Sequence, residues 1–323
     1  MNSTTTKANP RHLRIKQYDR QTRSKLMRRY WRLYLLLALP LIYLLIFKYY
    51  PMLGVQIAFR KFDTAGGIWN SEWVGLHYFE KFFTSSKFKR VVPNTIIISL
   101  YSLLAGFPVP IILALSLNTL RNERYKKLIQ TITYVPHFIS TVVLVGILFQ
   151  TFNVRSGLVG VAYNAIFNRT MPDLFGKPAS FRHLFVWSGV WQSMGWSSII
   201  YIAALAGVDP ELHEVAQIDG ASRFKRVIHI DLPSILPTAV ILLILNSGSI
   251  MSVGFEKVYL MQNNLNLRAS EVISTYVYKV SMTAGTSDFS YGTAIDLFNA
   301  VINLAMLLLV NSISHKLSST SLW

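Results

Sequence analysis

The chain has 323 residues, of which 52% are hydrophobic and 15% are charged, and its mean hydropathy is +0.36. This composition is too apolar for an ordinary soluble domain of this length, so a membrane protein is expected. The sequence contains no cysteine, which excludes disulfides, thiolate metal sites and cysteine nucleophiles. A formal net charge of +17 could favour nucleic acid, so the position of the charges along the chain decides their meaning.

Six long apolar runs are predicted to cross the membrane as helices, because a hydrocarbon layer ~30 Å thick needs about 20 such residues. They are Leu33–Pro51, Thr95–Asn118, Thr131–Phe152, Leu184–Gly207, Ile235–Phe255 and Tyr291–Ser314. A closed barrel would instead show alternating strands of ~10 residues. The predicted fold class is therefore an all-α, polytopic membrane protein.

The positive charge is concentrated before the first run, where Asp19 is the lone acidic residue. Positive residues that flank a first span stay in the cytoplasm, so both termini and the loop after the second span are predicted to be cytoplasmic. The external loop between the first two spans fits this rule poorly, since it contains basic residues: Arg60, Lys61, Lys81, Lys87, Lys89 and Arg90.

Three regions are predicted. Residues 1–32 form a basic cytoplasmic or interfacial arm, residues 33–315 form the six-helix membrane domain, and residues 316–323 form a short cytoplasmic tail. The arm lacks a recognisable nucleic-acid module, and a basic cluster beside a span attracts anionic lipid. We therefore expect membrane lipid, and no nucleic acid, as its partner. In the first external loop, His77–Phe83 is predicted to be an interfacial helix.

Residues 209–233 lie between the fourth and fifth runs and read as a cytoplasmic helix, a stop and a second helix. Asp209 suits a helix N-cap and Pro210 the first helical position. Gly220 then supplies a C-terminal stop, and the second helix is expected to end where Leu232-Pro233 redirects the chain. An amphipathic hairpin that merely covers the ends of the spans is the alternative.

This segment resembles the EAA loop of ABC importer permeases, whose pattern is E-A-A, three residues, G, nine residues and I-x-L-P. Val215 replaces the first alanine of that pattern. The resemblance implies a coupling helix that docks on a separate ATPase, with these matching residues: Glu214, Ala216, Asp219, Gly220, Ala221, Ile230, Leu232 and Pro233.

Further segments resemble the carbohydrate-importer permeases of the LplB type, among them Asn94-Thr95, Tyr134-Val135-Pro136, Gly254–Met261 and Ser274–Tyr278. Within that group the chain is especially similar to the alginate-importer permease, with pectic-fragment importers next. The resemblance implies the fold of an ABC type I importer permease in a bacterial cytoplasmic (inner) membrane. It further implies a heterodimer with a second permease, although a homodimer stays open. Two ATPase subunits would hold ATP and Mg, and a periplasmic or extracellular solute-binding protein would deliver substrate. This chain would be no enzyme and would bind no cofactor or metal.

A saccharide path needs hydrogen-bonding side chains and aromatic faces inside the bundle. Polar groups in spans usually face the bundle or a water-filled cavity, although many join helices instead. Glu256 and Asp296 are the acids expected nearest the membrane interior, in structural or gating roles. The candidate path residues are Trp191, Gln192, Trp196, Asn246, Ser249, Ser252, Asn299 and Asn303.

Two other classes of protein compete with this interpretation. A membrane-embedded enzyme would need a catalytic motif such as G-x-x-x-x-G-K-[ST], H-E-x-x-H or G-x-S-x-G, and the sequence contains none of them. An ion-coupled secondary transporter would show inverted repeats, and no repeat is evident. An ABC permease for a different solute remains the third alternative.

Overall fold

The computed structural model describes residues 29–282 and 288–317. The chain divides into two compact units, Met1–Gly54 and Val55–Trp323, and each is described by itself. Most of the predicted basic arm (residues 1–28) and most of the predicted tail (residues 318–323) lie outside the described residues.

The first unit is an apolar helix. It begins as α2 (Trp31–Leu44), passes through the π-helical turn η1 (Leu45–Tyr49) and continues as α3 (Tyr50–Met52). The 3-10 helix η2 (Leu53–Phe59) leads into the second unit. Residues Trp31–Phe59 together are long and apolar enough to cross a membrane. No side chain of α2 is buried.

The second unit consists of helices and one short ribbon of two strands, β1 (Arg60–Lys61) and β2 (Glu72–Trp73), which pair antiparallel with Arg60 opposite Trp73. The all-α prediction missed this ribbon. The helices in chain order are α4 (Gly67–Asn70), α5 (His77–Thr84), α6 (Phe88–Gly106), α7 (Pro108–Asn118), α8 (Glu123–Tyr134), η3 (Val135–Phe138), α9 (Thr141–Thr151), α10 (Leu158–Phe167), α11 (Pro178–Leu205), α12 (Pro210–Ile218), α13 (Arg223–Arg226), η4 (Val227–Asp231), α14 (Leu232–Ser247), α15 (Phe255–Met261), α16 (Leu267–Ser270), α17 (Ile273–Met282) and α18 (Phe289–Leu317).

Among the described residues, four helical stretches are long and apolar enough to cross a membrane: Trp31–Phe59, Phe88–Asn118, Arg223–Ser247 and Phe289–Lys316. The pair Glu123–Phe138 and Thr141–Thr151 would be a fifth, but it bends by 104°. The predicted span Leu184–Gly207 falls in α11, which has 28 residues and is not counted with these because its Trp and Ser residues lower its mean hydropathy.

Two predicted spans differ from the observed helices. The run Thr131–Phe152 is broken, because Ile139 and Ser140 are extended and Ser140 starts a new helix by accepting the Val143 N–H. The run Ile235–Phe255 stops early, since α14 ends at Ser247 and a turn through Gly248 leads to α15. The helix predicted over His77–Phe83 is present as α5, whose buried face holds Tyr78 and Phe82, and its position at the membrane interface stays a prediction.

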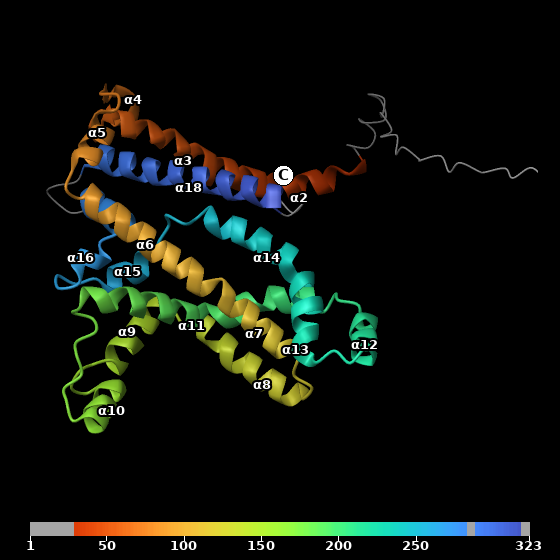
Figure 1. Ribbon diagram of the computed structural model, residues 1–323. Helices are drawn as coiled ribbons and strands as arrows, with labels where there is room; N and C mark the ends of the chain where they lie inside the picture. The colour runs from red at the N-terminus through yellow and green to blue at the C-terminus, as the bar shows by residue number, and fades with distance from the viewer. Residues whose placement is uncertain (1–28, 283–287, 318–323) are drawn as a thin grey trace, which may run out of the picture. The chain divides into compact units, whose positions relative to one another are not determined.

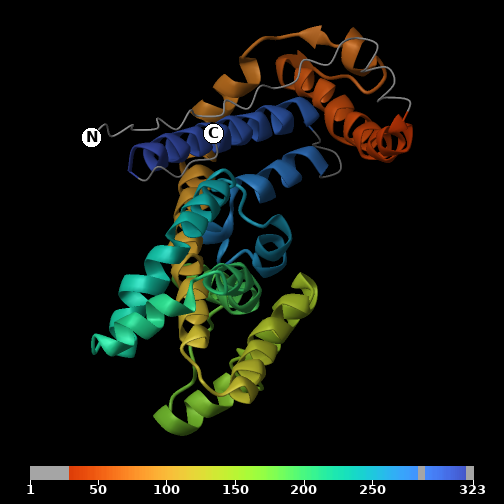
Figure 2. The same ribbon diagram turned by 90° about the vertical axis from the view of Figure 1, so that its right-hand side faces the viewer.

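Helix α11 lies at the centre of the second unit, where it packs against α6, α7, α8, α14 and α16 (Figures 1 and 2). Its N-terminal half contributes Phe181 and Phe185 to one apolar core, and its C-terminal half contributes Tyr201 and Leu205 to another. A third core joins α5 and α17 to the start of α18. The three cores hold the ends of these helices in place, and polar side chains gather at those ends.

The pair Asn94-Thr95 attaches the segment before α17 to α6. Asn94 Nδ2 donates to the carbonyls of Arg268 (2.9 Å) and Glu271 (3.0 Å), and Thr95 Oγ1 accepts the N–H of Ile273 (3.0 Å). Both side chains are buried, where an unmade hydrogen bond is costly. The pair therefore positions α16 and α17 from a helix more than 170 residues earlier in the chain.

Replacing Asn94 by alanine should destabilise this attachment. The buried Glu271 carbonyl would lose its donor, at a cost of about 1–3 kcal/mol. We expect Asn94→Ala to lower the unfolding temperature of the purified protein, as measured by tryptophan fluorescence. Thr95→Ser, which keeps the hydroxyl group, should leave this temperature nearly unchanged. Equal midpoints for Asn94→Ala and the parent protein would refute this role.

Candidate functional site

The segment between α11 and α14 forms a helical hairpin whose first helix, α12, begins at a defined residue. The Asp209 carboxylate accepts the N–H of Glu211 at 3.0 Å, and Pro210 occupies the first helical position. Proline costs nothing there because that N–H has no partner within the helix. The predicted N-terminus is confirmed.

Helix α12 ends at Gly220, which has a φ of +75°. The Gly220 N–H reaches the Gln217 carbonyl (3.1 Å) and the Ala221 N–H reaches the Ala216 carbonyl (2.8 Å), which is the Schellman pattern of helix termination. Glycine adopts this left-handed conformation without steric cost. A Cβ built on Gly220 would meet nothing within 4 Å, so the requirement for glycine here comes from the backbone rather than from crowding within this chain.

The second helix does not stop where it was expected to. Residues Arg223–Ser247 form one helical stretch, so the prediction that Leu232-Pro233 redirects the chain was wrong. The π-helical turn η4 immediately precedes this pair, and it contains His229, whose carbonyl cannot receive an N–H from Pro233. A wider turn accommodates such a proline. The same arrangement occurs in the first unit, where η1 precedes Pro51.

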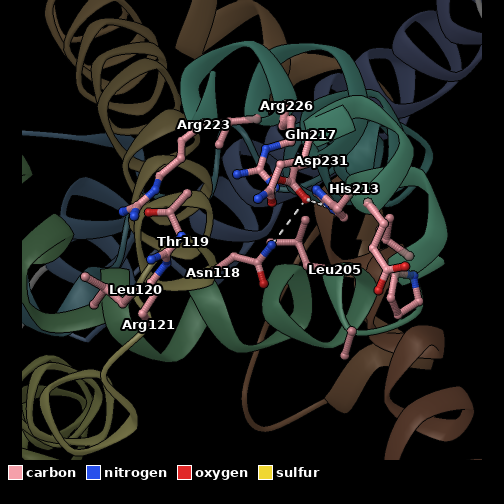
Figure 3. Close-up of a pocket in the computed structure, with 15 residues that line it drawn as sticks. Asn118, Thr119, Leu120, Arg121, Leu205, His213, Gln217, Arg223, Arg226 and Asp231 are labelled. Atoms are coloured by element: carbon pink, nitrogen blue, oxygen red, sulfur yellow. Dashed lines mark hydrogen bonds and ion pairs between the residues drawn. The ribbon is translucent and has the colours of Figure 1, made fainter. Parts of the chain in front are cut away.

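Asp231 joins three elements at the base of the hairpin. Its carboxylate lies 3.3 Å from His213 Nε2 of α12 and accepts a hydrogen bond of 3.2 Å from Asn118 Nδ2 at the end of α7. Only 2% of Asp231 is exposed. Because a buried carboxylate needs such partners, it ties α12 and η4 to the C-terminal end of α7 (Figure 3).

A cavity of about 560 Å³ lies beside this junction, and α7, α11, α12 and α13 line it. Arg121, Arg223 and Arg226 bring positive charge to its wall, as Figure 3 shows. Glu214 lines it from α12, and the Arg226 side chain reaches Gln217 at 3.5 Å.

The apolar side chains of α12 are uncovered in this chain. Leu212, Val215 and Ile218 are all more than half exposed, with Ile218 at 86%. A hairpin that merely covered the ends of the spans would bury these side chains. Of the residues predicted for coupling, Glu214, Ala216 and Asp219 lie on α12 or its C-cap, Gly220 and Ala221 form the stop, Ile230 lies in η4, and Leu232 and Pro233 begin α14.

Three predicted path residues meet in one cavity. Asn246, Ser249 and Ser252 line a space of about 310 Å³ between α6, α11 and the end of α14. Sequence analysis missed the other hydroxyl groups that line it: Ser99, Ser102, Ser193 and Ser197. Ser99 Oγ is buried and has no hydrogen-bond partner in the described structure.

The remaining predicted path residues lie elsewhere. Gln192 donates to the Ile139 carbonyl (2.8 Å), and Trp196 stacks on His137 with ring centroids 4.6 Å apart, so both hold α11 against the bend after η3. Trp191 lines a separate, largely apolar cavity. Asn303 accepts the Met251 N–H and donates to Ser252, whereas Asn299 Oδ1 is buried without a partner in the described residues.

Glu256 and Asp296 are exposed in this chain, and their structural or gating roles stay predictions. The buried acid that the sequence did not indicate is Glu271, which is 2% exposed beside Lys87, Arg90 and Lys279.

Lys257 is buried too. Its Nζ donates to the Phe185 carbonyl at 2.8 Å, and burial lowers its pKa to about 8. Neither Glu271 nor Lys257 lies in an apolar run, so hydropathy gave no signal for them. In residues 29–282 and 288–317, no group of three or more His, Asp or Glu side chains could hold a metal.

The left-handed conformation of Gly220 predicts how substitutions at this position change the stability of the hairpin. Gly220→Ala should destabilise the end of α12 by about 1–2 kcal/mol, because a Cβ disfavours positive φ. Gly220→Asn should cost less, since asparagine tolerates this region better. Hydrogen exchange of the α12 amides would measure the difference, and equal exchange in both variants would contradict the backbone explanation.

Comparison with known proteins identifies the family. The sequence pattern of the binding-protein-dependent transport system inner membrane component matches residues 106–319. Protein LplB of Bacillus subtilis is 43% identical over 90% of this chain and 91% of its own length. The polygalacturonan/rhamnogalacturonan transport system permease protein YteP of the same organism is 40% identical over 90% of each chain.

A solved bacterial ABC transporter involved in the import of the acidic polysaccharide alginate contains a chain with the same fold. Its TM-score is 0.84 at 36% identity, covering 91% of this chain and 99% of that one. A second structure of the alginate transporter, in complex with an alginate pentasaccharide-bound periplasmic protein, matches equally well. A permease of this family is the transmembrane component of the transporter and is not itself catalytic. This chain therefore belongs to the inner-membrane permease family of binding-protein-dependent ABC importers.

Proposed function

We propose that this chain is the permease half of an ATP-driven importer that moves acidic oligosaccharides, such as alginate or pectic fragments, by alternating access. The observation that carries the substrate class is the similarity to two permeases of acidic polysaccharides: the YteP protein, at 40% identity, and the alginate transporter chain, at 36%. The hydroxyl-lined cavity between α6, α11 and α14 supports a sugar as the transported solute.

The proposed topology has six spans and both termini in the cytoplasm, in the fold of an ABC type I importer. The six spans are the four apolar stretches, the bent pair and α11. The 28 residues of α11 correspond to ~42 Å of helix at 1.5 Å per residue, which exceeds the ~30 Å of the hydrocarbon layer. Helix α11 packs against α6, α7 and α14, and its Ser193 and Ser197 line the cavity beside them, which explains how a less apolar helix can cross.

The proposed assembly pairs this chain with a second, homologous permease, two ATPase subunits that hold ATP and Mg, and a solute-binding protein outside the membrane. The uncovered apolar side chains of α12 support docking of the hairpin on an ATPase. Asp231 would transmit the motion of α12 to both α7 and α14, because its carboxylate contacts residues of α7 and α12 and lies directly before α14.

Coupling can be tested at Glu214 and Gly220 in the assembled transporter. A partner arginine could form a charge-assisted pair with Glu214 worth roughly 1.5–3 kcal/mol if shielded from water. Gly220→Val should lose subunit assembly or substrate-stimulated ATP hydrolysis, together with uptake, and Glu214→Ala should be milder. Both activities are measured in vesicles with the binding protein present. Normal uptake by Gly220→Val would make the hairpin only a connector.

The sugar path can be tested at the hydroxyl-lined cavity. Ser249→Ala removes a hydrogen-bonding group without adding bulk, and we expect uptake to fall by about ten-fold or less for one lost bond. Ser156→Ala, at an exposed position outside this cavity, is the matched control. Uptake of acidic and neutral oligosaccharides is compared in the same vesicles. Uptake confined to neutral sugars would contradict the proposed substrate class.

A further inference from the structure

A basic pocket lies at the outer ends of α6 and α11. It has a volume of about 420 Å³, and its charged lining consists of Lys89 and Arg90 of α6, Arg182 of α11 and Arg268 of α16. No acidic residue lines it. These cations include part of the charge in the first external loop that the positive-inside rule leaves unexplained.

Few of these cations are neutralised within the chain. Arg90 pairs with Glu271, but that carboxylate is shared with Lys87 (3.6 Å) and Lys279 (3.7 Å). In the described part of the chain, Lys89 and Arg268 form no ion pair. A concentration of like charge without counter-charge is unfavourable unless an anion from outside the chain occupies the pocket.

A hydrogen bond fixes the position of the Arg182 side chain in this pocket. Its Nη2 donates to Asn94 Oδ1 at 2.9 Å, while the amide of Asn94 is fixed by its hydrogen bonds to the carbonyls of Arg268 and Glu271. The Nε atoms of Arg90 and Arg182 are buried, and neither has an acceptor in the described structure. Fixed guanidinium groups with unused N–H donors suit the oxygen atoms of a phosphate.

The pocket opens onto an apolar stripe of α6. Ile97 forms part of the pocket wall, and it is followed along the helix by Leu100 and Leu104, all of them more than 40% exposed. Their spacing places them on one face. An occupant that matches both features has an anionic head and an apolar body, and a soluble oligosaccharide has only the first.

We propose that this outer basic pocket binds an anionic phospholipid, with the headgroup phosphate on Lys89, Arg182 and Arg268 and an acyl chain along the stripe of α6. The first turns of α6 and α11 lie at headgroup depth in the proposed topology, on which the choice of the outer leaflet rests. On the cytoplasmic side of membranes, basic pockets between helices hold lipid headgroups, and the same pairing of guanidinium and phosphate can form at the outer end of a bundle. The lipid would occupy the groove between α6, α11 and α16 and brace the attachment made by Asn94.

The test uses the assembled transporter in phosphatidylcholine bilayers with and without phosphatidylglycerol. The double variant Lys89→Gln/Arg268→Gln removes two charges whose side chains hold no described element together. Arg155→Gln/Arg169→Gln, at exposed positions outside the pocket, is the charge-matched control. Lipid retained after detergent extraction is counted by native mass spectrometry, and the unfolding temperature is measured by tryptophan fluorescence in both bilayers.

We expect the parent protein to retain phosphatidylglycerol in preference to phosphatidylcholine. The pocket variant should retain about ten-fold less phosphatidylglycerol and lose any thermal protection by it, and the control should behave as the parent does. Equal retention of both lipids, or an equal loss in the control, would overturn the proposal. So would displacement of the lipid by a soluble acidic oligosaccharide. None of these measurements requires transport, so failure here is distinct from failure of the importer assignment.

Discussion

The buried carboxylate of Asp231 is the contact on which the hairpin end of this permease depends. It accepts a hydrogen bond from Asn118 and lies beside His213, so the end of α7, the exposed helix α12 and the start of α14 share one polar junction. Removing one partner of such a buried group leaves an unsatisfied charge, which costs more than the contact itself contributes. The hairpin is therefore attached to the spans, although its apolar face is open.

Buried polar contacts also organise the opposite end of the second unit, where α6 and α11 begin. Asn94 and Thr95 hold the segment before α17, and Glu271 collects three cations from α6 and α17. Between the two polar junctions, α11 packs through apolar cores. Each polar junction keeps its own group of helices together, and apolar packing joins the two groups. This arrangement suits a bundle in which a movement at one end changes the shape of the other end.

Much of this arrangement was predictable from local sequence. The caps at Asp209 and Gly220 follow from single residues whose preferences are strong, and both are observed. Asn94-Thr95 was recognised only as a family resemblance, and its hydrogen bonds give it a physical role. The break in the third predicted span was missed, because hydropathy counts apolar residues and does not register the Ser140 N-cap at which α9 starts.

Partners that lie far apart in the sequence could not be found in this way. Asp231 was read as the variable position of a loop pattern, since nothing local indicates Asn118, which lies 113 residues earlier. The exposed α12 side chains and the hydroxyl groups that α6 contributes to the central cavity likewise depend on tertiary contacts.

We expect α12 and the C-terminal end of α7 to move as one body when the proposed ATPase closes, because Asp231 joins them. The chain lacks cysteine, so spin labels can be placed at Glu211→Cys and Ser116→Cys, both exposed. Pulsed electron paramagnetic resonance then measures the distance between the labels in the assembled transporter. The distance should be the same with and without ATP, and it should change with ATP when Asp231→Ala accompanies the labels. A distance that shifts with ATP in the protein with Asp231 intact would show that α12 moves independently of the spans and would refute this role of Asp231.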